Sequence, residues 1–173
     1  YFSLHFTCLG FEVLVSTIAG SCDILQPTDA ENLRSSLKLD WGAVRASRMF
    51  ASRGVVNGTA YAELLEGEEP LTMNFHAWGL YLQDFVSNTV LRSYLRVLST
   101  STDAQGREYV STVEARKYPF FGTQWHPEKN AFEWTPSQKI PHSPDAVAVT
   151  SFFAQLLGAE ARESAHVFGS EGE

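Results

Sequence analysis

Cys8 lies in a short segment whose pattern would place a thiol at the start of a helix: Phe6-Thr7-Cys8-Leu9-Gly10-Phe11-Glu12. Apolar residues predict a strand over Leu4–Thr7 and a helix over Leu9–Ala19. The free N–H groups and the dipole of a helix N-terminus favour a thiolate. The N–H of Leu9 could also stabilise an oxyanion, and Gly10 favours a tightly packed turn. Cys8 is therefore a candidate nucleophile, although an isolated cysteine is more often a buried structural residue.

A second segment contains the base that a thiol nucleophile needs: Gly122-Thr123-Gln124-Trp125-His126-Pro127-Glu128-Lys129. We expect a strand over Phe120–Trp125 to lead directly into His126, with Pro127 ending its ladder of hydrogen bonds. A histidine there can take the proton of a thiol and later protonate a leaving amine. Glu128 could orient the imidazole and stabilise the imidazolium. A His-Pro-Glu turn alone is more often a surface turn, but together with Cys8 it indicates a cysteine hydrolase.

The two segments resemble the signature segments of gamma-glutamyl hydrolase, the folate-polyglutamate hydrolase of the class I glutamine amidotransferase-like superfamily. Three further segments agree with that family in residues and in order: Ser47-Arg48-Met49-Phe50, Asn74-Phe75-His76-Ala77-Trp78, and Phe132-Glu133-Trp134 followed by Pro141-His142-Ser143. The resemblance runs from residue 1 to about Arg162. It predicts a catalytic domain over residues 1–162 and a polar tail over residues 163–173.

The resemblance implies that Cys8 is the nucleophile, that His126 is the general base and acid, and that Glu128 is the third member of the site. Four further residues are candidates for substrate binding or for support of the site: His76 (the family's second active-site histidine), Gln124, Leu9 and Glu12. A structural role for His76, and packing roles for Gln124 and Glu12, stay open. No cofactor and no metal are expected, because the Cys and His residues lack metal-ligand spacing.

The reaction implied by the resemblance is hydrolysis of γ-glutamyl amide bonds through a γ-glutamyl thioester. The expected partners are small molecules, namely the poly-γ-glutamates of folates or antifolates. Such polyanions call for local positive charge, for example from Arg48, Arg53 or Lys129. The alternatives are a related glutaminase that delivers ammonia to a synthetase, a hydrolase of small γ-glutamyl amines, and an inactive fragment or pseudoenzyme.

Composition limits the classes of protein that are compatible with the chain. Its 173 residues are 44% hydrophobic and 19% charged, as in a folded soluble domain. The formal net charge of -7 argues against a nucleic-acid partner, and no apolar run reaches the roughly 18 residues of a membrane span. A homodimer stays open. By family resemblance only, the compartment would be the lysosome, the vacuole or the extracellular space.

Strands interleaved with helices predict an α/β fold. Its expected form is a partial doubly wound (flavodoxin-like) sheet of the class I glutamine amidotransferase type. Val97–Thr102 and Glu108–Ala115 predict an antiparallel hairpin, and Ser143 predicts the cap of a helix that ends near Glu160. The remaining predictions are a strand at Cys22–Leu25, a loop-rich stretch from Gln26 to Arg53, a helix at Tyr61–Leu65, a strand at Leu71–Phe75 and a helix at Thr89–Leu95.

The N-terminal residues have the pattern of a buried strand and not that of a signal peptide. In a doubly wound sheet, two or three βα units normally precede the strand that carries the nucleophile. We therefore expect upstream strands to be missing from this chain. We also expect the bulky Phe6 to crowd the turn at Cys8, because a small residue usually stands at that position.

Overall fold

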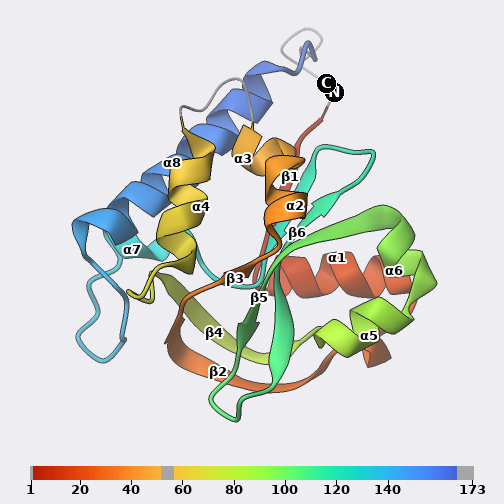
Figure 1. Ribbon diagram of the computed structural model, residues 1–173, viewed down its shortest axis with the longest axis horizontal. Helices are drawn as coiled ribbons and strands as arrows, with labels where there is room; N and C mark the ends of the chain where they lie inside the picture. The colour runs from red at the N-terminus through yellow and green to blue at the C-terminus, as the bar shows by residue number, and fades with distance from the viewer. Residues whose placement is uncertain (1, 52–56, 167–173) are drawn as a thin grey trace, which may run out of the picture.

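The computed structural model describes residues 2–51 and 57–166, and these residues form a mixed five-stranded sheet with helices on both faces (Figure 1). The strand order is β1-β7-β6-β5-β3. β1 (Leu4–Thr7) and β7 (Phe120–Thr123) are parallel. The other neighbours are antiparallel and include β6 (Glu108–Ala115), β5 (Leu95–Thr102) and β3 (Lys38–Leu39). The predicted α/β class and the predicted hairpin are confirmed.

A separate antiparallel ribbon of two strands lies beside this sheet in the described part of the chain. It pairs β2 (Gln26–Ser35) with β4 (Thr72–Gly79), from Gln26 opposite Gly79 to Ser35 opposite Thr72. In Figure 1 the ribbon curves along the lower edge of the molecule, next to the hairpin of β5 and β6.

Two hydrophobic clusters cover opposite faces of the sheet. One includes Phe121 of β7 and Phe152 of α8 (Pro144–Arg162), and it is completed by α4 (Gly58–Glu66). The other includes Phe11 of α1 (Leu9–Ala19). The short helices are η1 (Cys22–Ile24), α2 (Trp41–Arg45), α3 (Arg48–Ala51), α5 (Leu82–Ser87), α6 (Thr89–Tyr94) and α7 (Lys129–Phe132). The arrangement sandwiches the sheet between α1 and α8.

The ends of the two long helices follow from local sequence signals. α1 stops at Gly20, which takes φ 76° and donates its N–H to the carbonyl of Ser16. α8 starts at Ser143, whose hydroxyl accepts a hydrogen bond from the N–H of Ala146. The predicted helix start at Ser143 is confirmed, and α8 extends two residues beyond the predicted end, to Arg162. Residues 167–173 of the predicted tail lie outside the described residues.

Three local predictions are wrong. Cys22–Ile24 is a 3₁₀ turn and not a strand, because the hydroxyl of Ser21 caps it by accepting from the N–H of Asp23. The stretch predicted to be loop-rich contains β2, β3, α2 and α3, while Arg53 lies outside the described residues. β4 continues past His76 to Gly79, because its pairing with β2 continues to Gln26.

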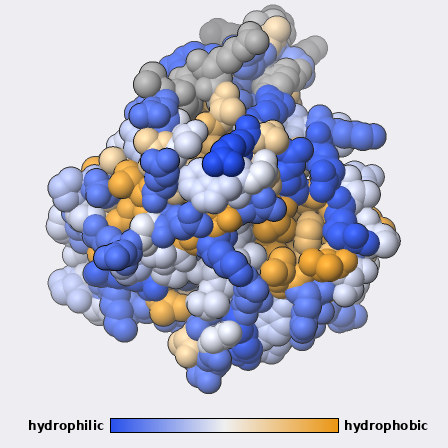
Figure 2. All heavy atoms as spheres, in the orientation of Figure 1, coloured by the Kyte–Doolittle hydropathy of each residue, from blue (hydrophilic) through white to orange (hydrophobic). Residues whose placement is uncertain are grey.

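The surface seen in Figure 2 is mainly hydrophilic, with separate apolar patches between the polar side chains. Among residues 2–51 and 57–166, no helix combines the length and the apolar character that crossing a lipid bilayer requires.

Candidate active site

Cys8 occupies a constrained turn between β1 and α1. Its backbone has φ 53° and ψ -109°, in the half of φ space that residues with a side chain rarely adopt. The N–H of Cys8 donates to the carbonyl of Thr123 over 2.8 Å, and its carbonyl accepts from the N–H of Glu12 over 3.1 Å. The strand and the helix therefore impose this conformation from both sides, as in a nucleophile elbow. The thiol is half-buried, and its Sγ lies 3.7 Å from the carbonyl oxygen of Phe75.

His126 contacts both of the other candidate catalytic residues. It lies three residues beyond the end of β7, which stops at Thr123 and not at the predicted Trp125. Its Nδ1 is 2.6 Å from Oε1 of Glu128. A carboxylate can only accept a hydrogen bond, so the donor is Nδ1–H of His126. The ring also forms a hydrogen bond with the Cys8 side chain, and Nε2 is the ring atom left for it. The backbone N–H of His126 donates to the carbonyl of Met73 over 2.9 Å. The structure thus brings Cys8, His126 and Glu128 together.

The electrostatics of these three residues favour a proton on the imidazole. Burial would lower the pKa of His126, but the hydrogen bonds and charges of Cys8 and Glu128 outweigh it and raise the pKa to about 9. Burial would raise the pKa of Glu128, yet the hydrogen bond and the charge of His126 hold it below its ordinary value. A charged carboxylate therefore supports an imidazolium, which is what a base that holds the proton of a thiol requires.

The first turn of α1 presents backbone groups next to the thiol. Leu9 is 68% exposed, so it would act through its backbone N–H and not through its side chain. The first N–H groups of a helix have no hydrogen-bond partner within the helix. A Cβ added at Gly10 would lie 3.8 Å from the Cβ of Phe6, an ordinary contact distance. The turn therefore has room for Phe6, and the expected crowding is not observed.

Gln124 and Glu12 form a contact beneath the turn. Nε2 of Gln124 donates to Oε1 of Glu12 over 3.1 Å, and the N–H of Gln124 donates to the carbonyl of Ser111. Burial raises the pKa of Glu12, against the opposing effect of the Gln124 hydrogen bond. This contact ties the end of β7 to α1, so both residues are placed to support the positions of Cys8 and His126.

His76 lies in a different environment. It is 3% exposed, its Nδ1 lies 2.9 Å from the carbonyl oxygen of Trp78 and 3.0 Å from Oγ1 of Thr28, and its ring packs edge-on against Tyr109. Burial is the main reason that its pKa falls to about 4, and the nearby charge of His126 adds to this effect. His76 is therefore neutral, and none of the side-chain contacts in the described part joins it to Cys8. Its predicted role in substrate binding stays a prediction.

An apolar cavity of about 290 Å³ adjoins the site. Its walls include Thr7, Met49, Phe121, Phe132 and Leu157. Of the three candidate catalytic residues in the described chain, only Glu128 lines it. The cavity therefore borders the site on the carboxylate side and does not open onto the thiol.

The cations predicted for a polyanionic substrate are paired in this structure. Arg48 lies 3.0 Å from Glu160, and Lys129 lies 2.7 Å from Glu133 and over the ring of Phe75. Arg53 lies outside the described residues. Within residues 2–51 and 57–166, His, Cys, Asp and Glu side chains form no group of three or more suited to a metal ion.

Sequence reasoning missed the contribution of β4 to this site. The carbonyls of Met73 and Phe75 contact His126 and Cys8, yet backbone groups leave no residue-type signal in a sequence. Thr28 was missed as well, because 48 residues separate it from the His76 ring that it contacts.

The fold and the site together define an α/β protein with a Cys-His-Glu arrangement at the end of its parallel strand pair. No family model matches the chain. Human gamma-glutamyl hydrolase is 40% identical to it over 173 residues, which cover 100% of this chain and 52% of the human protein. Gamma-glutamyl hydrolase 2 of Arabidopsis thaliana is 41% identical over 170 residues, covering 95% of this chain and 46% of the plant protein.

Gamma-glutamyl hydrolase B of Dictyostelium discoideum is 33% identical over 172 residues, covering 99% of this chain and 48% of that protein. The chain is thus a relative of the gamma-glutamyl hydrolases along its whole length. It spans about half the length of the curated relatives that it matches.

Proposed function

We propose that this chain hydrolyses γ-glutamyl amide bonds with Cys8 as the nucleophile. The observation that carries the proposal is the chain of contacts from the Cys8 thiol through the His126 imidazole to the Glu128 carboxylate, 2.6 Å from Nδ1. The kind of bond is supported by the relatives, whose name is gamma-glutamyl hydrolase. The resemblance of the sequence motifs supports the poly-γ-glutamate tails of folates as the substrate.

The first half of the reaction forms a thioester. His126 Nε2 takes the thiol proton, and the Cys8 Sγ electron pair attacks the γ-carbonyl carbon. The carbonyl electron pair moves to oxygen, and the N–H of Leu9 would donate a hydrogen bond to this oxyanion. When the tetrahedral intermediate collapses, the C–N bond breaks and the leaving amine takes the proton from His126.

The second half releases the acyl group. Neutral His126 takes a proton from water, and the resulting hydroxide attacks the thioester carbon. The C–S bond breaks, the γ-carboxylic acid leaves, and the thiolate regains its proton. Glu128 keeps Nδ1–H in place throughout, so that Nε2 always faces the reacting atoms.

The test compares the purified chain with two single-cysteine variants. Cys8→Ala removes the proposed nucleophile, and Cys22→Ala removes an exposed cysteine as a matched control. Each protein is incubated with a folate pentaglutamate and, separately, with glutamine. We expect glutamate or glutamate peptides to be released from the folate by the wild type and by Cys22→Ala only.

Equal release by Cys8→Ala, or no release by a folded wild-type chain, would overturn the proposal. Ammonia released from glutamine, with no cleavage of the folate tail, would instead identify the glutaminase alternative.

A further inference from the structure

The strand β4 contacts both reacting side chains, although it does not belong to the sheet that carries them. The carbonyl of Phe75 faces the Cys8 Sγ at 3.7 Å, and the carbonyl of Met73 accepts from the His126 N–H at 2.9 Å. The Phe75 ring also packs edge-on against the His126 ring, with 6.0 Å between centroids. The position of the β2–β4 ribbon relative to the five-stranded sheet therefore affects the geometry of the candidate site.

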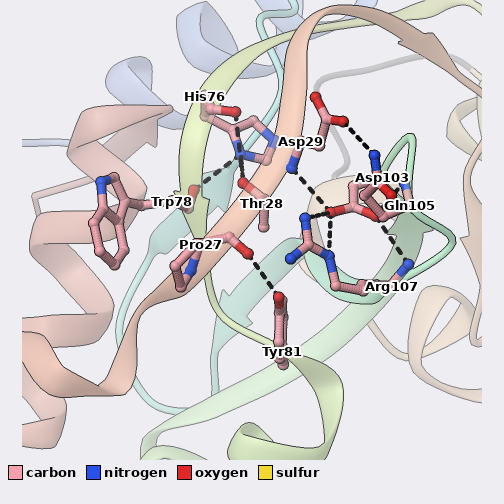
Figure 3. A network of polar contacts seen from close by, with 9 residues as sticks. All are labelled: Pro27, Thr28, Asp29, His76, Trp78, Tyr81, Asp103, Gln105 and Arg107. Atoms are coloured by element: carbon pink, nitrogen blue, oxygen red, sulfur yellow. Dashed lines mark hydrogen bonds and ion pairs between the residues drawn. The ribbon is translucent and has the colours of Figure 1, made fainter.

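The ribbon is attached to the five-stranded sheet at the turn between β5 and β6 (Figure 3). The N–H of Asp29, on β2, donates to Oδ2 of Asp103 over 2.9 Å. In return the carbonyl of Asp29 accepts from the N–H of Ala104 over 2.9 Å, and its carboxylate accepts from Nε2 of Gln105 over 2.8 Å. Three hydrogen bonds thus join one residue of the ribbon to one turn of the hairpin.

The Asp103 carboxylate is buried and fully engaged. Its side chain has no exposed surface. Its oxygens accept from the N–H groups of Gln105 and Arg107 at 3.0 and 2.9 Å, and from Nε and Nη2 of Arg107 at 2.8 and 2.7 Å. Burial would raise the pKa of Asp103, but these hydrogen bonds and the one from Asp29 outweigh it and lower the pKa. A buried carboxylate is costly unless it is satisfied in this way, so the turn holds a charged acceptor for the Asp29 N–H.

The attachment continues from Asp29 towards β4. The adjacent Thr28 lies 3.0 Å from Nδ1 of His76, and the Tyr81 hydroxyl donates to the carbonyl of Pro27 over 2.6 Å. His76 is the immediate neighbour of Phe75 on β4. The hairpin turn is therefore linked through β2 to the part of β4 that contacts the thiol.

We propose that Asp103 is a positioning residue, whose carboxylate holds the β2–β4 ribbon so that the carbonyls of Met73 and Phe75 keep Cys8 and His126 in reacting geometry. The inference rests on the proposed function for its effect on hydrolysis. Its effect on the Cys8–His126 contact does not depend on any substrate.

The experiment compares Asp103→Asn with Glu108→Gln, both in a Cys22→Ala background so that Cys8 is the one thiol present. Asp103→Asn keeps the side chain's size but replaces one accepting oxygen with a donor that faces Asp29 or Arg107. Glu108→Gln is the matched control, because Glu108 lies in the same hairpin and binds Lys38 and Thr100 instead of β2. The measurements are the pH profile of Cys8 alkylation by iodoacetamide, kcat and KM on a folate pentaglutamate, and thermal unfolding.

We expect Asp103→Asn to fold, to lower kcat by about 10- to 100-fold with little change in KM, and to alter the pH profile of Cys8 alkylation. Glu108→Gln should match the background protein in all three. If Asp103→Asn does not fold, Gln105→Ala is measured instead, since it removes only the exposed hydrogen bond to Asp29. We expect this milder change to lower kcat about twofold.

A folded Asp103→Asn with lower thermal stability but unchanged kcat and alkylation profile would overturn the positioning role and leave the proposed function intact. For Gln105→Ala, an unchanged kcat and alkylation profile would count against the role in the same way. If the background protein itself releases no glutamate, the proposed function fails, and the alkylation profiles alone then decide whether Asp103 positions Cys8 and His126.

Discussion

Two histidines in this molecule each have Nδ1 within hydrogen-bonding distance of an oxygen atom, yet their pKa values shift in opposite directions. His126 donates Nδ1–H to the Glu128 carboxylate at 2.6 Å, and His76 directs Nδ1 at the carbonyl of Trp78 at 2.9 Å. The pKa of His126 is raised to about 9, whereas that of His76 is lowered to about 4. At neutral pH the first ring therefore carries a proton that the second cannot hold.

The difference lies in the charge of the partners and in the burial of each ring. The side chain of His126 is 17% exposed, and its neighbours are a carboxylate and a thiol. His76 is 3% exposed and lies among a carbonyl, a hydroxyl and an aromatic ring, none of which carries charge. Desolvation lowers the pKa of both rings. For His126 the contacts with Cys8 and Glu128 reverse that effect, whereas for His76 the hydrogen bond to Trp78 and the charge of Asp103 do not. The comparison separates a histidine suited to proton transfer from one suited to a neutral buried network.

The largest expected effect comes from removing the ring of His126. His126→Gln should lower kcat for γ-glutamyl hydrolysis by roughly 10²- to 10⁴-fold, because the thiol then lacks its base and the amine its acid. His142→Gln is the control, since that ring stacks on Trp134 and lies 2.8 Å from the carbonyl oxygen of Asn130, and none of its contacts in the described part of the chain joins it to Cys8 or His126. Steady-state kinetics on a folate pentaglutamate measure the effect. Similar rates for the two variants would remove His126 from the mechanism.

The next largest expected effect is on the pKa of His126 when the Glu128 carboxylate is removed. In Glu128→Gln, the pKa of His126 should fall from about 9 towards its ordinary value of 6.5, because the hydrogen bond and the charge of Glu128 are lost while burial and the contact with Cys8 remain. NMR titration of the histidine ring resonances follows the change, with the pKa of His76 as the internal reference. A His126 pKa that stays near 9 would show that Glu128 does not contribute to the raised value.

His76 should make the protein sensitive to acid. Its pKa in the folded state lies below its unfolded value of 6.5, so the unfolded chain takes up the proton first as pH falls. Stability should therefore decrease from about pH 6.5 down to pH 4, by an amount on the order of 3 kcal/mol. Urea unfolding at several pH values, with His76→Gln as the comparison, measures this contribution. If the two proteins lose stability in parallel over that range, the pKa of His76 is not lowered.

His126 should affect the pH dependence of stability in the opposite direction. Because its folded pKa lies above 6.5, its contribution to stability is complete below pH 6.5 and is lost as pH rises towards 9. The same unfolding series, continued to pH 9.5 and repeated with His126→Gln, tests this. A variant that loses as much stability as the wild type between pH 6.5 and pH 9 would contradict the raised pKa.

The smallest expected effect comes from Thr28→Val and should be confined to the surroundings of His76. Thr28→Val removes the hydroxyl at 3.0 Å from Nδ1 of His76 and keeps the branched shape, so it should cost about 1 kcal/mol of stability. The pKa of His126 should not change, and Thr28→Ser, which retains a hydroxyl, is the control. A shift in the His126 pKa in Thr28→Val but not in Thr28→Ser would show that the two histidine environments are coupled through the ribbon.

Local patterns were sufficient to predict the elements around the thiol. Leu4–Thr7 and Leu9–Ala19 were predicted with the bounds that the structure has, because an apolar strand followed by a helical repeat is a signal between near neighbours. The hairpin and the cap at Ser143 were predictable for the same reason. β2 was not, because it is rich in polar residues and its pairing is interrupted by bulges, one of them at Asn32 with φ 54°.

By itself, the sequence determined which residues could carry chemistry. Cys8 at a strand-to-helix junction and His126 two residues before Glu128 are patterns of type and spacing, and both can be read from the chain alone. Only the tertiary structure decided how β4 contacts these residues, how Asp103 attaches the ribbon, and why two histidines differ in pKa. Burial and the charge of a partner depend on residues that are distant in sequence and close in space, and spacing along the chain carries no record of them.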